Sequence, residues 1–585
     1  MTVVVENTID VTEPLVSATR RAFEANEIKE GIFRNCDRKS LRNLAVVDRQ
    51  WSEAALDVLW YEVTALEDLL RPLGPVTSTN REIQTVIVHT VTPPSRPNRF
   101  STGSTTTTTS SSVTEITYEL SPSPTHRHWL RFQRHYAPRV RILRFKVIDT
   151  RKTRSLVNLL LQMRSFEALL PNLRVIHWDT LCNIGLAEPM FAFAHDVVQE
   201  LNLTDIQEHC PDKSITCEAI LTRMPKLTKL VLEILPDEKY IPSLISIMEG
   251  LTSLQSLTIS PFSNMSEIVS CLSGLQKLKE LHILSGNRFI NVHSPFSLRN
   301  SNSSYFSVLE RITLSCAYQI ASGFFCCEVP SLIAIRVVTS IREQPSDVQN
   351  ILRTISGSCP RVTQISLEIR HNTIDLSALR APLSPESALT LEVLSSILQR
   401  SSICSFSIQH PLPFDVGLGE VETIASSWPR LKSLSLACDP YLVQQPTTSY
   451  KLGVDAFLPF VRHCPDIEEL GLFIDARSSA IPSNEVLDAL PSPFTKLRIL
   501  SVGTSVIRHE EAIAQFLSFI CTQGCIIKQG VSWFEQYGQH LGESARKWME
   551  VNRLLRNLLA VRIWYERKLV LEMRRLQANL CDQTK

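Results

Sequence analysis

The feature that most constrains this chain is a short apolar motif, Leu-x-x-Leu-x-Leu with Val, Ile or Phe as substitutes. It recurs about fourteen times between residues 83 and 502. One clear copy has its apolar positions at Leu227, Leu230 and Leu232. The alternation within a copy gives the period of two that a β-strand needs. Because one copy cannot bury its apolar face alone, each must pack on a neighbour, and the recurrence predicts a solenoid.

The intervals between copies predict helices. Beyond a longer first gap, successive copies are about 23 to 41 residues apart, and helical patterns such as 388–398 and 511–520 fill the intervals. Strand, helix and strand running in one direction demand a parallel sheet with helices outside it. The central apolar residues of the copies are Val86, Leu143, Ile176, Leu201, Leu230, Leu257, Leu281, Ile312, Ile335, Ile365, Phe406, Leu434, Leu470 and Leu500.

Proline supports the same register. It cannot continue a helix and biases the residue before it to extended geometry, so we expect it to end a helix and start a strand. Cys359, Trp428 and Cys464 precede three of these prolines, and we expect them to fill the helix-to-strand corners. The prolines, each two residues before a strand motif, are Pro138, Pro171, Pro225, Pro330, Pro360, Pro429 and Pro465.

The flanks of the repeat region differ in pattern. Residues 1–20 are polar and expected to be disordered, whereas 21–70 predict three short helices, with Asp37 and Ser52 as caps of the second and third. The repeats span 80–505, interrupted by a Ser/Thr/Pro-rich segment, 91–124, that we expect to be a flexible loop; phosphorylation of that tract is an alternative role. Residues 506–585 predict a helical cap over the open end of the array, with a basic amphipathic helix on a membrane or nucleic acid as the alternative.

The composition favours a binding protein inside the cell. A net charge of +1 gives no reason to expect nucleic acid or a membrane surface as a partner, and no apolar run reaches the roughly 20 residues needed to span a bilayer. The fifteen cysteines are scattered along the chain, which predicts reduced thiols packed in the core. This is typical of a cytoplasmic or nuclear protein. We find no catalytic motif, and expect no enzyme activity, no metal and no cofactor. His126, His128 and the pair His463-Cys464 lack partners at ligand or nucleophile spacing.

The face of the sheet opposite the helices is the best candidate binding surface. Within each copy, residues between the apolar positions point away from the core, and a face built from many strands suits a protein better than a small molecule. A solvated face without a ligand is the alternative. The candidate substrate-binding residues on this concave face are Glu200, Asn202, Lys229, Glu280, His282, Arg311, Gln364, Glu368 and Glu469.

The helices ahead of the repeats carry a family resemblance. Residues 26–60, followed by leucine-rich repeats, resemble an F-box protein with leucine-rich repeats, in particular the large, irregular F-box family of mushroom-forming fungi. The likeness covers about 40 residues closely and the rest by architecture. The residues that match the family are Ile28 and Ile32 in its first helix, Leu41, Leu44 and Val47 in its apolar ladder, and Trp51 as its tryptophan.

The resemblance implies a role in protein degradation. In the family such a stretch docks on a Skp-type adaptor of a cullin-scaffolded (SCF) ubiquitin ligase, and the repeats hold a protein substrate. By that likeness, Ile28, Ile32, Leu41, Leu44, Val47 and Trp51 are the adaptor-binding residues. The family usually opens with Leu-Pro, which lies at the adaptor contact, where this chain has Ala25 and Asn26. A protein-binding scaffold with a degenerate F-box and no ligase role is therefore the second hypothesis.

Overall fold

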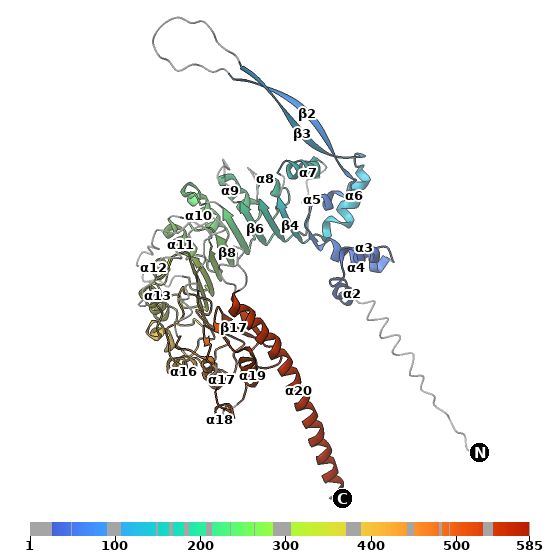
Figure 1. Ribbon diagram of the computed structural model, residues 1–585. Coiled ribbons are helices and arrows are strands. Elements are labelled where there is room, and N and C mark those ends of the chain that lie inside the picture. Colours follow the sequence, from blue (N-terminus) through green and yellow to red (C-terminus); the bar gives the residue numbers. More distant parts are fainter. Residues whose placement is uncertain are drawn as a thin grey trace, which may run out of the picture. The chain divides into compact units, whose positions relative to one another are not determined.

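The computed structural model describes residues 26–47, 49–89, 107–147, 150–162, 168–180, 187–205, 213–234, 236–262, 264–284, 306–369, 388–440, 450–478, 482–488, 490, 492–530 and 542–583. The expected disorder of residues 1–20 lies outside these ranges. The chain divides into two compact units, one of residues 1–235 and 242–254 and one of residues 236–241 and 255–585. Both units are α/β. Their repeats form a parallel sheet of fifteen strands with helices outside it (Figure 1). The predicted parallel array is thus confirmed.

The first unit begins with a small helical module. Its helices are α2 (Asn26–Phe33), α3 (Arg38–Leu44) and α4 (Arg49–Tyr61). Asp37 caps α3 as expected, with its carboxylate accepting a hydrogen bond from the Ser40 amide at 2.7 Å. Ser52, predicted as the cap of the third helix, lies instead within α4. Because α4 runs directly into strand β1 (Glu62–Val63), the module is joined to the sheet without a linker.

One predicted repeat strand is not part of the parallel sheet. Val86 lies in β2 (Val76–His89), which pairs antiparallel with β3 (Thr107–Leu120) as a separate two-stranded sheet. The prediction was wrong because an alternating pattern marks a strand without specifying its pairing partner. Part of the expected loop 91–124 is likewise a strand, since β-branched Thr favours extended structure; residues 90–106 lie outside the described residues. The sheet starts instead at β1, where Val63 pairs with Leu143.

The remaining repeats of the first unit follow the predicted register. Its strands are β4 (Ile142–Val147), β5 (Val175–Thr180), β6 (Glu200–Asp205) and β7 (Lys229–Ile234), parallel and in sequence order. The predicted central residues Leu143, Ile176, Leu201 and Leu230 are direct register partners and are buried. The helical elements of this unit beyond the module are α5 (Leu66–Leu70), α6 (His126–His135), η1 (Ala137–Arg139), α7 (Thr150–Gln162), α8 (Ala187–Met190), α9 (Lys213–Arg223) and α10 (Ile241–Gly250, apart from its first residue).

The second unit continues the pattern. From Leu257 in the first of its strands to Leu500, every predicted central residue again lies opposite the next along the sheet. The register then extends to Ile527, which was not predicted. The strands of this sheet are β8 (Ser256–Ile259), β9 (Glu280–Ile283), β10 (Arg311–Ser315), β11 (Ala334–Thr339), β12 (Gln364–Ile369), β13 (Ser405–Ile408), β14 (Ser433–Leu436), β15 (Glu469–Leu472), β17 (Ile499–Gly503) and β19 (Ile526–Gln529).

Helices separate most of these strands, and small elements complete the unit. The short strands β16 (Asp475–Ala476) and β18 (Val506–Ile507) pair with each other in a separate parallel sheet. The helical elements are η2 (Glu238–Tyr240), α11 (Met265–Leu272), α12 (Tyr318–Phe324), α13 (Pro345–Ser358), η4 (Leu391–Leu394), α15 (Ser395–Leu398), α16 (Leu418–Ser427), η5 (Val454–Phe457), α17 (Leu458–His463), α18 (Asn484–Asp488), α19 (Glu510–Ile520) and α20 (Glu543–Gln583).

The helix-to-strand corners are filled as the prolines suggest. Cys359, Trp428 and Cys464 are the residues that terminate α13, α16 and α17, and none of them exposes any surface. The Trp428 indole donates to the carbonyl of Ile397, 3.4 Å away on the preceding repeat. Each corner residue thus contributes apolar area that only stacked repeats can bury.

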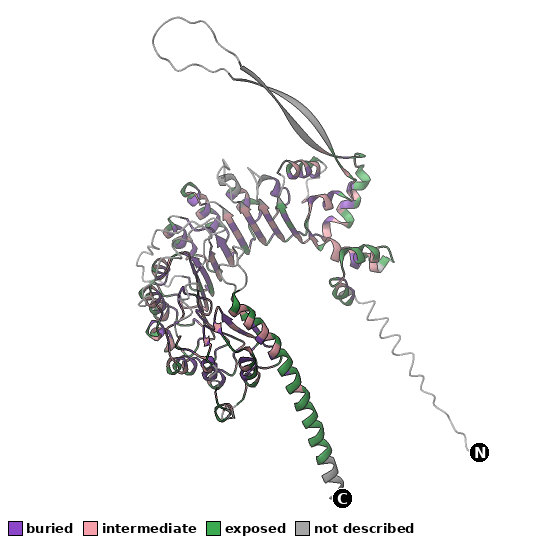
Figure 2. Ribbon diagram, viewed as in Figure 1, coloured by how far each residue is buried: buried purple, intermediate pink, exposed green. Residues whose placement is uncertain are grey.

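The last helix, α20, changes character along its length. Its first part packs on α19 and β19 and buries Trp548, Val551, Leu555 and Leu559. Asn552 accepts a hydrogen bond from the Ile527 amide of β19 at 3.2 Å. Beyond residue 560 nearly all described residues are exposed (Figure 2). The first part therefore covers the final strand of the sheet, whereas the second extends away from it.

Candidate protein-binding surfaces

The predicted adaptor-binding residues divide into two groups in the module. Leu41 is buried beside Phe33, and Leu44 and Trp51 pack against the same core at intermediate exposure. The Trp51 and Phe33 rings are 5.6 Å apart. These side chains hold the three helices together, so their substitution would disturb the module itself rather than a surface alone.

The other group is exposed. Ile28 and Ile32, at i and i+4 of α2, expose 45% and 44% of their area, and Val47 exposes 63%. Val46, which the sequence pattern did not single out, is 83% exposed. On the same helix Lys29 and Phe33 are buried, so α2 presents one face to the module core and another, apolar face to solvent. We call Ile28, Ile32, Val46 and Val47 the exposed apolar set.

An arginine fixes the module to the start of the sheet. Arg139, in the short helix η1, forms ion pairs with Glu53 and Asp57 of α4 and donates to the Glu53 carbonyl at 3.0 Å. Next to it the rings of Trp60 and Tyr136 lie 4.8 Å apart. Arg139 is mostly buried whereas both carboxylates are half exposed, so the pairs position α4 more than they stabilise it.

The sheet strands place the predicted substrate-binding residues as the alternation requires. Glu200, Asn202, Glu280, His282 and Glu368 are half-buried, whereas the others are more exposed. Asn202, His282 and Glu368 lie between buried apolar residues of their strands, and the other six are the first residues of theirs. In every case the next residue is a buried apolar one, so by the alternation of a strand these side chains point to the face opposite the core. The more exposed residues are Lys229, Arg311, Gln364 and Glu469.

Many of these side chains contact each other across neighbouring strands. Glu200 pairs with Lys229 at 3.7 Å in the first unit, and Glu280 with Arg311 at 2.6 Å in the second. His282 shares a hydrogen bond of 2.9 Å with Thr313, which is itself buried. Partial burial acts to raise the pKa of Glu280, but hydrogen bonds from Arg311 and Ser256 outweigh it and leave that pKa below its ordinary value.

Two further pairs on this face were missed from the sequence. Arg336 donates to both carboxylate oxygens of Glu368, at 2.8 and 2.6 Å, and Arg144 lies 3.4 Å from Glu62. The spacing of the strand motif could have identified them, because each pair is diagonal across two neighbouring strands. Arg336 stands opposite Ser366, two residues before Glu368, and Glu62 stands opposite Ile142, two residues before Arg144. The face is thus lined by alternating, locally compensated charges, a pattern that favours a polar protein surface over a ligand of one sign.

Titratable groups elsewhere are engaged in structural contacts. Burial raises the pKa of both Cys359 and Cys464 to about 12, so these thiols stay protonated at neutral pH. His463 contacts Glu422 at 2.6 Å, and His128 accepts a hydrogen bond from the Thr125 amide at the start of α6.

Across the described ranges, no three His, Cys, Asp or Glu side chains converge as metal ligands would. Within those same ranges, none of the helices is long and apolar enough to cross a bilayer.

Comparison with known proteins finds weak structural similarity and no match in sequence. No protein-family model matches the chain, and no curated protein matches it in sequence. Among solved structures it is similar to the crystal structure of the Rad7 and Elc1 complex in yeast, with 16% sequence identity over 64% of this chain and 87% of that chain. The TM-score of 0.30 is too low to establish a shared fold.

Proposed function

We propose that this chain is a substrate-recognition adaptor of a cullin-type (SCF) ubiquitin ligase, and that it binds rather than catalyses. The module docks on a Skp-type adaptor, and the repeats hold a protein substrate. The observation that carries the proposal is the exposed apolar set on a module whose own core is already complete. Ile28 and Ile32 share one face of α2, and Val46 and Val47 follow α3 in the same small module. Apolar side chains left outside a finished core mark an interaction surface when they are concentrated on so small a module.

The energetics of the exposed apolar set fit the core of an interface. Its four side chains expose the equivalent of about two and a third whole residues, so burying them is worth roughly 3.5–7 kcal/mol before association costs. A micromolar complex needs about 8 kcal/mol. Polar contacts around the set must therefore supply the remainder, and removing one of these side chains should weaken the complex measurably.

The face of the sheet supports the second half of the proposal. Its charged residues are held in cross-strand pairs, such as Arg336 with Glu368, which fix their positions before a partner arrives. A partner that meets side chains already ordered loses less entropy on binding. A protein substrate with its own alternating charges can exchange contacts with such a surface, and charge complementarity then decides which substrate is chosen.

Direct titration with a purified Skp-type adaptor tests the docking. Ile32→Asp should weaken adaptor binding at least about tenfold, because it places a charge in the apolar centre of the interface. Ile341→Asp is the matched control, since Ile341 is exposed to a similar degree, 45% against 44%, but lies outside the module. No saturable binding by the folded chain, or equal loss in both variants, would contradict the proposal.

A scaffold without a ligase role is the second candidate function. Two observations favour it: α2 begins at Asn26, where the family has Leu-Pro, and Arg139 ties α4 to the first repeats as a structural lid would be tied. The titration separates the two candidates. If the chain is a scaffold, we expect that it does not bind the adaptor but that another partner still binds the repeats. Arg336→Glu on the sheet face should then weaken the binding of this partner.

A further inference from the structure

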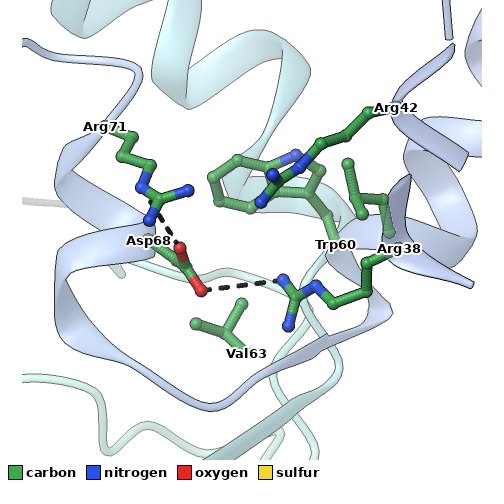
Figure 3. A pocket seen from close by; sticks show the side chains of 7 residues that line it. Arg38, Arg42, Trp60, Val63, Asp68 and Arg71 are labelled. Atoms are coloured by element: carbon green, nitrogen blue, oxygen red, sulfur yellow. Dashed lines mark ion pairs between the residues drawn. The ribbon is translucent and has the colours of Figure 1, made fainter.

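A pocket rich in arginine lies where the module meets the first repeat. Its walls come from α3, α4, β1 and α5, all within the first unit. Figure 3 shows the guanidinium groups of Arg38, Arg42 and Arg71 directed toward its centre, where the Asp68 carboxylate lies, with the Trp60 ring as one wall. Three cations thus surround one anion, and the charged side chains that line the pocket carry a net charge of +2.

The arginine donors are incompletely used. Asp68 lies 3.6 Å from Arg38 and 3.4 Å from Arg71, longer than the roughly 2.7–2.9 Å of a charge-assisted hydrogen bond. Among the described residues, Arg42 forms no ion pair, and it stands exposed in the last turn of α3. A single carboxylate therefore cannot saturate three planar guanidinium groups, each with several donors.

The size and lining of the pocket fit a compact oxyanion attached to an apolar group. Its volume is about 110 Å³, several times the roughly 10–15 Å³ that one ordered water needs. Trp60 is half-buried against Tyr136, so its ring has a fixed position beside the charges. Arginine pairs with phosphate through parallel hydrogen bonds, and an aromatic wall can hold the organic part of a phosphate ester.

We infer that this pocket binds a phosphate monoester, with Arg42 as its principal ligand and Arg38 and Arg71 completing the contact. Asp68 competes with the ligand for these two arginines and so sets the affinity. Because the walls come from both the module and the first repeat, an occupied pocket stabilises their contact by linkage. The inference is independent of the proposed ligase role, since it needs neither the adaptor nor a substrate.

The test titrates the full-length chain with phenyl phosphate at low ionic strength, by calorimetry and by the shift in melting temperature. Arg42→Gln should weaken binding roughly tenfold or more, because it removes one charge-assisted contact. Arg49→Gln is the matched control, as Arg49 is an exposed arginine on the neighbouring helix α4 that does not line the pocket. Asp68→Asn should tighten binding, because the competing carboxylate is gone.

The Asp68→Asn variant distinguishes a ligand site from a purely structural ion-pair cluster. Tighter binding in that variant, weaker binding in Arg42→Gln and no change in Arg49→Gln would support the inference. Absence of saturable binding, equal loss in Arg42→Gln and Arg49→Gln, or no gain in Asp68→Asn would overturn it. Inorganic phosphate identifies the source: equal affinity indicates a free anion, and tighter phenyl phosphate binding indicates an ester that contacts Trp60.

Discussion

Two tryptophans on one helix test whether α20 covers the end of the repeat array. Trp548 exposes no surface and donates from its indole to the Ser505 carbonyl at 2.9 Å. Trp564 is 58% exposed, and its ring contacts Tyr565 and Lys568 of the same helix. Truncating a buried Trp to Ala lowers the free energy of unfolding by about 3–5 kcal/mol. The same substitution at an exposed position lowers it by less than about 1 kcal/mol. We therefore expect Trp548→Ala to destabilise this end strongly and Trp564→Ala to leave it nearly unchanged.

Hydrogen exchange resolves where that loss occurs. Because the array can open locally, the amides of β19 and α19 report on the cap better than a single melting curve. If Trp548→Ala lowers the free energy of local opening by about 4 kcal/mol, exchange of these amides accelerates roughly a thousandfold. In the same variant, the amides of β9 and β10 should change little. Equal exchange in the two Trp variants would refute the assignment of the first part of α20 as a cap.

Three further outcomes follow from individual residues. Gly503→Ala should destabilise the last strands by more than about 1 kcal/mol, measured by urea unfolding, because Gly503 has φ +52° and an added Cβ would lie 1.6 Å from the Cys438 carbonyl oxygen. Burial lowers the pKa of His410 to about 4. As the pH falls from 6.5 to 4, the free energy of unfolding of the native chain should therefore drop by about 3 kcal/mol relative to that of His410→Gln. Unfolding curves of the two proteins, recorded over this pH range, measure the difference. Arg139→Ala should speed amide exchange in α4 by about tenfold or less, since its acidic partners are half exposed.

The sign of the His410 effect depends on which state binds the proton. His410 Nδ1 lies 3.2 Å from both the amide and the carbonyl of Leu412. A hydrogen bond to that carbonyl favours the protonated ring, but burial outweighs it and lowers the pKa of His410. Between pH 6.5 and 4 the unfolded chain takes up a proton that the folded chain excludes, so acidification destabilises the fold. Burial raises the pKa of Asp439 to about 6 and acts in the opposite direction, but this contribution is common to both proteins and cancels in their difference. A difference that did not change with pH would contradict the burial of His410.

The repeat register was predictable because one residue per copy had to be buried in every strand. Leu230, Ile335 and Leu470 could be assigned without coordinates, and neighbouring central residues pair directly. Val63 was missed because β1 is only two residues long, and Ile527 because Gly524 and Gln529 stand where the motif has apolar residues. Val86 was misassigned because a hairpin strand has the same period as a strand of a parallel sheet.

The candidate surfaces were harder to predict, because exposure depends on tertiary packing. Spacing places Leu41 and Ile32 equally on helix faces, but only the structure separates the buried leucine from the exposed isoleucine. The arginine pocket is invisible in sequence, since Arg42 and Arg71 lie far apart along the chain and meet only when α5 packs beside the module. Local patterns therefore give the strands, and side-chain contacts between elements give the sites.

The proposed role is tested most directly by purifying the full-length chain from its native cell and identifying the bound proteins by mass spectrometry. The account predicts peptides of a Skp-type adaptor and of a cullin with the native chain, and their loss with a folded Ile32→Asp/Val47→Asp variant but not with Ile341→Asp. Recovery of a folded native chain that carries neither protein would contradict it.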